Sequence, residues 1–131
     1  MATALTDPEG SSRAMWGGIV AYANDMKEQL LAVPAALLAQ HGAVSPEVAK
    51  AMAEGAVKNT TATLAVSITG IAGPGGGTAT KPVGLVEFAT FAKGDKTAQA
   101  NTAHFEGDRA TIRHLAALHA LNLLKARLEA L

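Results

Sequence analysis

The glycine-rich segment Gly70–Thr78 (Gly-Ile-Ala-Gly-Pro-Gly-Gly-Gly-Thr) is the part of this sequence that points most directly to chemistry. It lacks the Gly-Lys-Ser/Thr ending of a phosphate loop. A strand rather than a helix is expected after it, which excludes a dinucleotide fingerprint. Its glycines allow positive φ and leave backbone N–H groups free for an anion or a carbonyl. A flexible surface connection is the alternative, but glycines are costly to order, which favours a functional loop at the carboxyl end of a buried strand.

Two cations occur where helices are expected to begin, a position that is unfavourable for them unless an anion is near. Arg109 follows Asp108 in the first turn of the last helix, so its partner is either a bound phosphate or a neighbouring acid. Lys27 lies in the first turn after Asn24, where the helix dipole should lower its pKa and suit it to act as a base or as a donor to substrate. A solvated lysine paired with a nearby acid such as Asp25 is the alternative.

The other titratable residues give weaker signals. Tyr22, the only tyrosine, is expected at the end of a buried strand, where a core tyrosine with a bonded hydroxyl is the usual explanation. His114 and His119 are five residues apart, which is off the i, i+4 spacing of a metal-binding pair. The sequence has no cysteine, which excludes disulfides, zinc–thiolate sites and cysteine nucleophiles. We therefore expect neither a metal nor a cofactor.

Composition limits the class of protein. Hydrophobic residues make up 49% of the 131 residues and charged residues 17%, so we expect a single domain over residues 1–131 with its own core. Eleven basic residues balance eleven acidic ones, so no net field attracts nucleic acid or an anionic membrane. No apolar stretch is long enough for a membrane span, and the start lacks a targeting pattern. These features predict a soluble, cytoplasmic protein that binds neither nucleic acid nor a membrane.

Helical and strand patterns alternate along the chain. Strands are expected over Trp16–Tyr22, Thr63–Thr69, Leu85–Ala92 and Thr97–Phe105. The first should be buried on both faces, and the polar last one should lie at an edge. Helices are expected over Ala2–Thr6, Asn24–Leu31, Pro34–Gln40, from Ser45 to Lys58, and after Asp108. The alternation predicts the α/β class, as a three-layer α/β/α domain with a mixed β-sheet.

Several motifs also agree with a known family in order and spacing. The most specific is Ser67–Thr78, followed by Lys81-Pro82-Val83-Gly84. Further matching segments are Gly10–Ser12, Val20–Lys27, His41–Ser45 and Gly107–Arg109. In these segments, which extend over nearly the whole chain, the sequence closely resembles the CinA C-terminal domain family.

The resemblance implies an activity as well as the α/β/α fold. Members of the family hydrolyse nicotinamide mononucleotide to nicotinic acid mononucleotide and ammonia, without a metal. Tyr22, Lys27 and Arg109 match family positions in the catalytic pocket, and Lys27 could be the base. The implied partner is therefore a small-molecule nucleotide. The residues implied to bind it are Thr69, Gly70, Gly73, Pro74, Gly75, Gly76, Gly77 and Lys81.

The chain departs from the family pattern at its amino end. Family members begin with a helix and a strand that ends in Ala-Glu-Ser-Cys-Thr-Gly-Gly, whose serine is the expected nucleophile. Ser11 and Ser12 match a structural turn instead. We therefore expect a truncated domain that is impaired in catalysis, or else a non-catalytic nucleotide-binding or assembly module. Because a missing strand leaves an unpaired sheet edge, we also expect a homo-oligomer.

Overall fold

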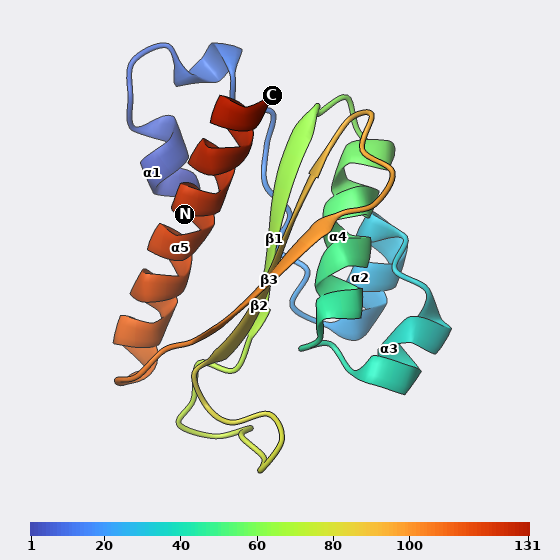
Figure 1. Ribbon diagram of the computed structural model, residues 1–131, viewed down its shortest axis with the longest axis vertical. Helices are drawn as coiled ribbons and strands as arrows, with labels where there is room; N and C mark the ends of the chain where they lie inside the picture. The colour runs from blue at the N-terminus through green and yellow to red at the C-terminus, as the bar shows by residue number, and fades with distance from the viewer.

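A three-stranded sheet lies between two layers of helices in the computed structural model, which describes residues 1–131 (Figure 1). The strands are β1 (Leu64–Gly70), β2 (Leu85–Ala92) and β3 (Gln99–His104). The helices are α1 (Ala2–Thr6), the 3-10 turn η1 (Ser11–Arg13), α2 (Asn24–Leu31), α3 (Ala35–His41), α4 (Pro46–Lys58) and α5 (Arg109–Ala130). Helices α1 and α5 cover one face, and α2, α3 and α4 lie on the other (Figure 1). The predicted α/β class is confirmed.

Strand β2 forms the centre of the core, and every one of its residues is buried. Because side chains alternate between the faces of a strand, β2 contributes to both helical layers. Phe88 is fully buried and clusters with Ile112 of α5. Ala89 clusters with Ala49 and Ala53 on the opposite face, where α4 packs. The side chains of residues 85, 87, 89 and 91 therefore share the α4 face.

The sequence predicts a mixed sheet, but both strand pairings, β1–β2 and β2–β3, are antiparallel. The difference arises from Trp16–Tyr22, for which the prediction of a buried strand is wrong. This segment is irregular, and Trp16, Val20 and Tyr22 are 58%, 84% and 86% exposed. Its backbone N–H groups make no hydrogen bond within the chain. An apolar sequence favours burial, but a strand also needs a neighbour to pair with, and β1 does not pair with this segment.

Local sequence signals correctly predict where most helices begin. The Ser45 hydroxyl accepts a hydrogen bond from the N–H of Val48 at 3.2 Å, and Pro46 occupies the first turn of α4. Asp108 caps α5 in the same way, accepting from the N–H of Thr111 at 2.8 Å. The predicted cap of α2 is displaced by one residue, because Asn24 is already helical and Ala23 is the capping residue. No helix has the length and hydropathy needed to cross a membrane.

Candidate functional site

The glycine-rich loop projects from the end of the sheet where β1 finishes, and α5 begins at the same end (Figure 1). Two hydrogen bonds extend the β1–β2 pairing into the loop. The N–H of Ile71 donates to the Leu85 carbonyl at 2.9 Å, and the N–H of Gly84 donates to the Ile71 carbonyl at 2.7 Å. Farther out, the N–H of Thr78 donates to the Lys81 carbonyl at 2.8 Å. The loop is thus held at its base and closed by a turn near its tip.

Glycine is required at specific positions of this loop. Gly73 has φ +78° and Gly76 has φ +87°, a region that side chains disfavour. A Cβ atom at Gly73 would also lie 2.5 Å from the Cγ1 atom of Val83. The peptide bond between Gly73 and Pro74 is cis. The positive φ angles at both positions, and the close approach of Val83 at Gly73, therefore favour glycine there.

The loop presents free backbone donors, as the sequence suggests. The N–H groups of Gly73, Gly75, Gly76 and Gly77 donate to no atom of the protein. Apart from Gly73, which is buried, these glycines are exposed. Consecutive unpaired N–H groups of this kind can bind an anion or a carbonyl oxygen.

Arg109 connects this loop to the start of α5. Its Nη1 atom donates to the Gly73 carbonyl at 3.0 Å, and the rest of the side chain is largely exposed. No acidic side chain forms an ion pair with it. Of the partners that the sequence leaves open for Arg109, a neighbouring acid is therefore not used. The guanidinium retains donors that can reach a bound anion.

Lys27 is buried on the opposite side of the sheet from α5. It is 5% exposed, and its Nζ atom donates to the carbonyls of Ala21 at 2.9 Å and Tyr22 at 3.3 Å. Burial lowers the pKa of Lys27. The direction agrees with the prediction, although its cause is desolvation. The Tyr22 side chain is exposed rather than part of the core, so only its carbonyl takes part in this arrangement.

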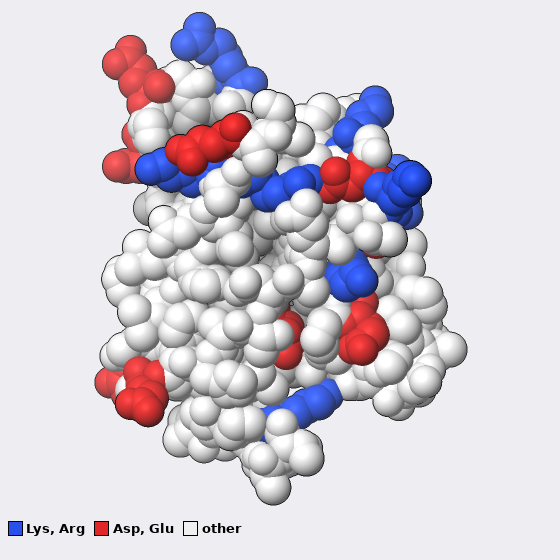
Figure 2. Space-filling view, viewed as in Figure 1, with Lys and Arg blue, Asp and Glu red and all other residues white.

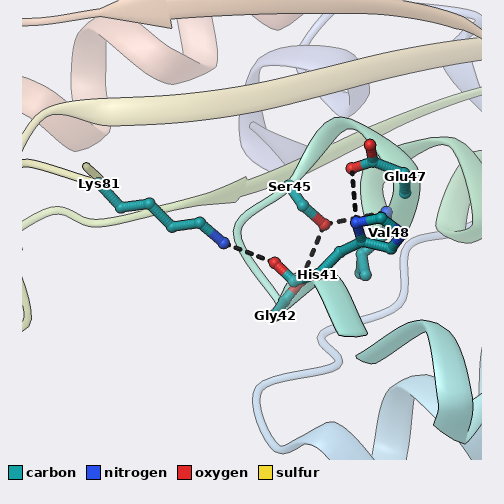
Figure 3. A network of polar contacts seen from close by, with 6 residues as sticks. All are labelled: His41, Gly42, Ser45, Glu47, Val48 and Lys81. Carbon is teal, nitrogen blue, oxygen red and sulfur yellow. Dashed lines mark hydrogen bonds and ion pairs between the residues drawn. The ribbon is translucent and has the colours of Figure 1, made fainter. Parts of the chain in front are cut away.

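Lys81 and Thr69 connect the loop end of the sheet to the turn before α4. Figure 3 shows the Lys81 ammonium directed at the His41 carbonyl, which it reaches at 2.6 Å. The Thr69 hydroxyl donates to the Ala43 carbonyl at 2.9 Å. The same turn is stabilised by Ser45, whose hydroxyl donates to the Gly42 carbonyl at 2.8 Å (Figure 3). Both predicted binding residues thus have a structural role in holding this turn.

The predicted site residues therefore form separate groups. Arg109 contacts the glycine loop, Lys81 and Thr69 contact the turn before α4, and Lys27 contacts the Ala21 and Tyr22 backbone. No hydrogen bond or ion pair joins Lys27 to the loop or to Arg109. The structure also contains a groove of about 370 Å³ between α1 and α5, lined by His114 and Leu118 among others, which involves none of these groups.

One residue at this end of the sheet was not predicted as a site residue. Glu87 is the third residue of β2 and is 4% exposed, although the strand is otherwise apolar apart from Thr90. An acidic residue inside an apolar run is itself a sequence signal, since buried carboxylates are rare unless they have partners. No three His, Asp or Glu side chains come together in a way that could hold a metal ion.

Comparison with known families and sequences gives one consistent result. A model of the CinA C-terminal domain matches residues 1–128. A CinA-like protein of Anaeromyxobacter dehalogenans is 52% identical over 129 residues, which cover 98% of this chain. A CinA-like protein of Mycolicibacterium gilvum is 49% identical over the same length. The chain spans 31% and 30% of the lengths of these two relatives.

Solved structures agree in fold. The competence/damage-inducible protein CihA of Agrobacterium tumefaciens superimposes with a TM-score of 0.90 at 43% identity, covering 95% of this chain and 76% of that one. A competence-damaged protein (CinA) superfamily protein of Escherichia coli gives a TM-score of 0.87 at 36% identity, covering 94% of this chain and 70% of that one.

Proposed function

Because the chain belongs to the CinA C-terminal domain family, we propose that residues 1–131 form a nicotinamide-nucleotide amidase-like domain that binds nicotinamide mononucleotide. The observation that carries this proposal is the hydrogen bond from Arg109 to the Gly73 carbonyl. It places a guanidinium without an acidic partner beside a loop with unpaired N–H groups. Together they offer the charge and the donors that a phosphate monoester requires.

The amide chemistry needs a nucleophile, a base and donors that face the developing oxyanion. The glycine loop can supply donors, and Lys27, whose pKa is lowered by burial, is the candidate base. The motif Ala-Glu-Ser-Cys-Thr-Gly-Gly, expected from the family to supply the nucleophile, does not occur in residues 1–131. We therefore propose that these residues, by themselves, bind the nucleotide and hydrolyse it poorly.

A specific observation favours a second function, that of a non-catalytic binding module. Lys27 donates to two main-chain carbonyls, so its ammonium holds the backbone at Ala21 and Tyr22 in place. A lysine that makes these two hydrogen bonds has a structural role, and no hydrogen bond joins it to the glycine loop. Binding without hydrolysis is the behaviour that this arrangement would give.

Calorimetry with nicotinamide mononucleotide tests the binding step. Arg109→Ala should weaken binding by about 1.5–3 kcal/mol, because a charged hydrogen bond to the phosphate is lost. Arg113→Ala is the matched control, since Arg113 is exposed one turn farther along α5. Unchanged affinity in Arg109→Ala would remove Arg109 from the site.

An ammonia-release assay on the same nucleotide separates the two functions. Slow turnover supports the amidase-like domain, and binding without turnover supports the binding module. A chain extended upstream by a helix and a strand carrying the serine motif should release ammonia faster. If the extended chain stays inactive, the absence of that motif is not the cause of the low activity.

We also propose that the chain self-associates. The free edge of β1 and the unpaired Trp16–Tyr22 segment expose backbone groups and apolar side chains on the same chain. Neither segment contains a proline or a charged residue, which commonly protect free edges. The opposite edge strand, β3, is polar and exposed. A stable monomer in light scattering would contradict this proposal.

A further inference from the structure

Glu87 is a buried carboxylate that the proposed chemistry does not use. It points to the face of β2 on which α4 packs, the face that also carries Ala89 and Phe91. It forms no ion pair with any Lys, Arg or His side chain. Burying a carboxylate with no cation beside it is unfavourable unless its oxygens accept hydrogen bonds. The partners of both carboxylate oxygens of Glu87 therefore need to be identified.

Only one oxygen of the Glu87 carboxylate accepts a hydrogen bond within the protein. Glu87 lies between Thr69 of β1 and Thr102 of β3 in the strand register. The Thr102 hydroxyl donates to Oε2 at 2.6 Å, whereas the Thr69 hydroxyl donates to the Ala43 carbonyl. No group donates to Oε1. The only fully enclosed side-chain polar atom without a partner is Nε of Arg127, so Oε1 is not enclosed and reaches solvent.

This oxygen lies at the loop end of the sheet. Thr69, which is beside Glu87 in the register, is one residue from the end of β1 and is bonded to the turn before α4. In the space-filling view of this face, a few acidic atoms are visible among uncharged ones (Figure 2). Lys81 reaches the neighbouring part of the same turn, at His41 (Figure 3). The free oxygen of Glu87 therefore lies close to the turn before α4 and the end of β1.

We propose that Glu87 Oε1 accepts a hydrogen bond from a primary carboxamide and so selects an amide ligand over the corresponding carboxylate. This inference rests on the proposed function, in which the substrate carries an amide and the product a carboxylate. An amide nitrogen offers two N–H donors, whereas a carboxylate offers none and would bring a second acidic group against Glu87. The residue would therefore determine specificity and favour release of the acid product.

The test uses two fragments with the same ring, nicotinamide and nicotinate, titrated at millimolar concentration and followed by NMR. Nicotinamide should shift the signals of Thr69, Glu87 and Thr102 saturably. Nicotinate should bind at least about tenfold more weakly, the effect of losing a hydrogen bond to a charged group. Equal affinities, a preference for nicotinate, or shifts that avoid these residues would each overturn the proposal. This comparison needs no variant.

Glu87→Gln keeps the shape of the side chain and removes its charge. Nicotinate should then bind within about threefold of nicotinamide, because the repulsion is lost. Glu106→Gln is the control, since Glu106 is exposed in the segment before α5. The Glu87→Gln chain could still bind nicotinate much more weakly than nicotinamide while it binds the mononucleotide through Arg109. That result would overturn only the inference about Glu87. The wild-type chain could instead fail to bind the mononucleotide and still prefer nicotinamide to nicotinate. That result would overturn only the proposed function.

Discussion

At the scale of single residues, Lys27 shows how the fold changes the chemistry of a side chain. Its ammonium donates to two main-chain carbonyls, and burial lowers its pKa from the ordinary value of 10.5. The folded chain therefore releases its proton at a lower pH than the unfolded chain does. Between these two pKa values the unfolded chain binds more protons, so the free energy of unfolding rises with pH. Below the lowered value, the full cost of the buried charge is present.

This linkage gives a pH-dependent prediction. The difference in unfolding free energy between the wild type and Lys27→Met should shift in favour of the wild type as the pH approaches 10.5, by at most about 1.4 kcal/mol per pH unit. Urea denaturation at several alkaline pH values measures it. Lys93→Met, which removes an exposed lysine, is the control for charge loss without burial. A difference that falls with pH would contradict the assigned direction.

Residue types predict part of the candidate site. The sequence points to Arg109 and the glycine loop because a cation at a helix start and a costly loop both need an explanation, and the structure places them in contact. Glu87 was missed because its role depends on which neighbours leave Oε1 unpaired, and strand register determines this. The exposure of Tyr22 could not be predicted either, since it follows from the absence of a strand partner.

At the scale of elements, the crossing of α2 and α4 depends on one glycine. A Cβ atom at Gly55 would lie 1.8 Å from the carbonyl oxygen of Leu31, the last residue of α2. A glycine within a helix normally costs about 1 kcal/mol relative to alanine. Here it allows the two backbones to approach closely, which the alanine-rich composition alone does not reveal.

Gly55→Ala should therefore destabilise the chain by about 1–3 kcal/mol or more, the opposite of the usual effect of alanine in a helix. The free energy of unfolding in urea measures the effect. Gly18→Ala is the matched control, because a Cβ atom there would meet nothing within 4 Å. Equal stability of Gly55→Ala and the wild type would mean that the helices can separate at little cost.

Elements were predictable where the signal is local. The side chains of Ser45 and Asp108 each accept a hydrogen bond from a nearby N–H group, and the fixed φ of Pro46 suits the first turn of a helix. Helices α4 and α5 therefore begin where these residues indicate. The strand expected over Trp16–Tyr22 depends on a distant partner, and the apolar run does not identify one. The pairing of strands, rather than composition, determines that Trp16–Tyr22 is irregular and that the sheet is antiparallel.

At the scale of the whole molecule, the two edges of the sheet differ in character. Val20, 84% exposed in the unpaired segment, is an apolar side chain that association can cover. Val20→Lys should therefore weaken self-association by at least about tenfold, because a charge at a pairing edge opposes strand addition. Light scattering across a dilution series measures it. Ala100→Lys, on the polar edge strand β3, is the control and should leave association unchanged.

In the proposed function, the glycine loop and the start of α5 together bind a mononucleotide. An NMR titration of the chain with nicotinamide mononucleotide tests it most directly, because backbone signals report on each N–H group separately. We expect saturable shifts of the backbone N–H signals of the Gly73–Gly77 segment and of the first turn of α5, where Arg109 lies. Binding that shifts only other residues, such as those lining the groove between α1 and α5, or no saturable binding at all, would contradict it.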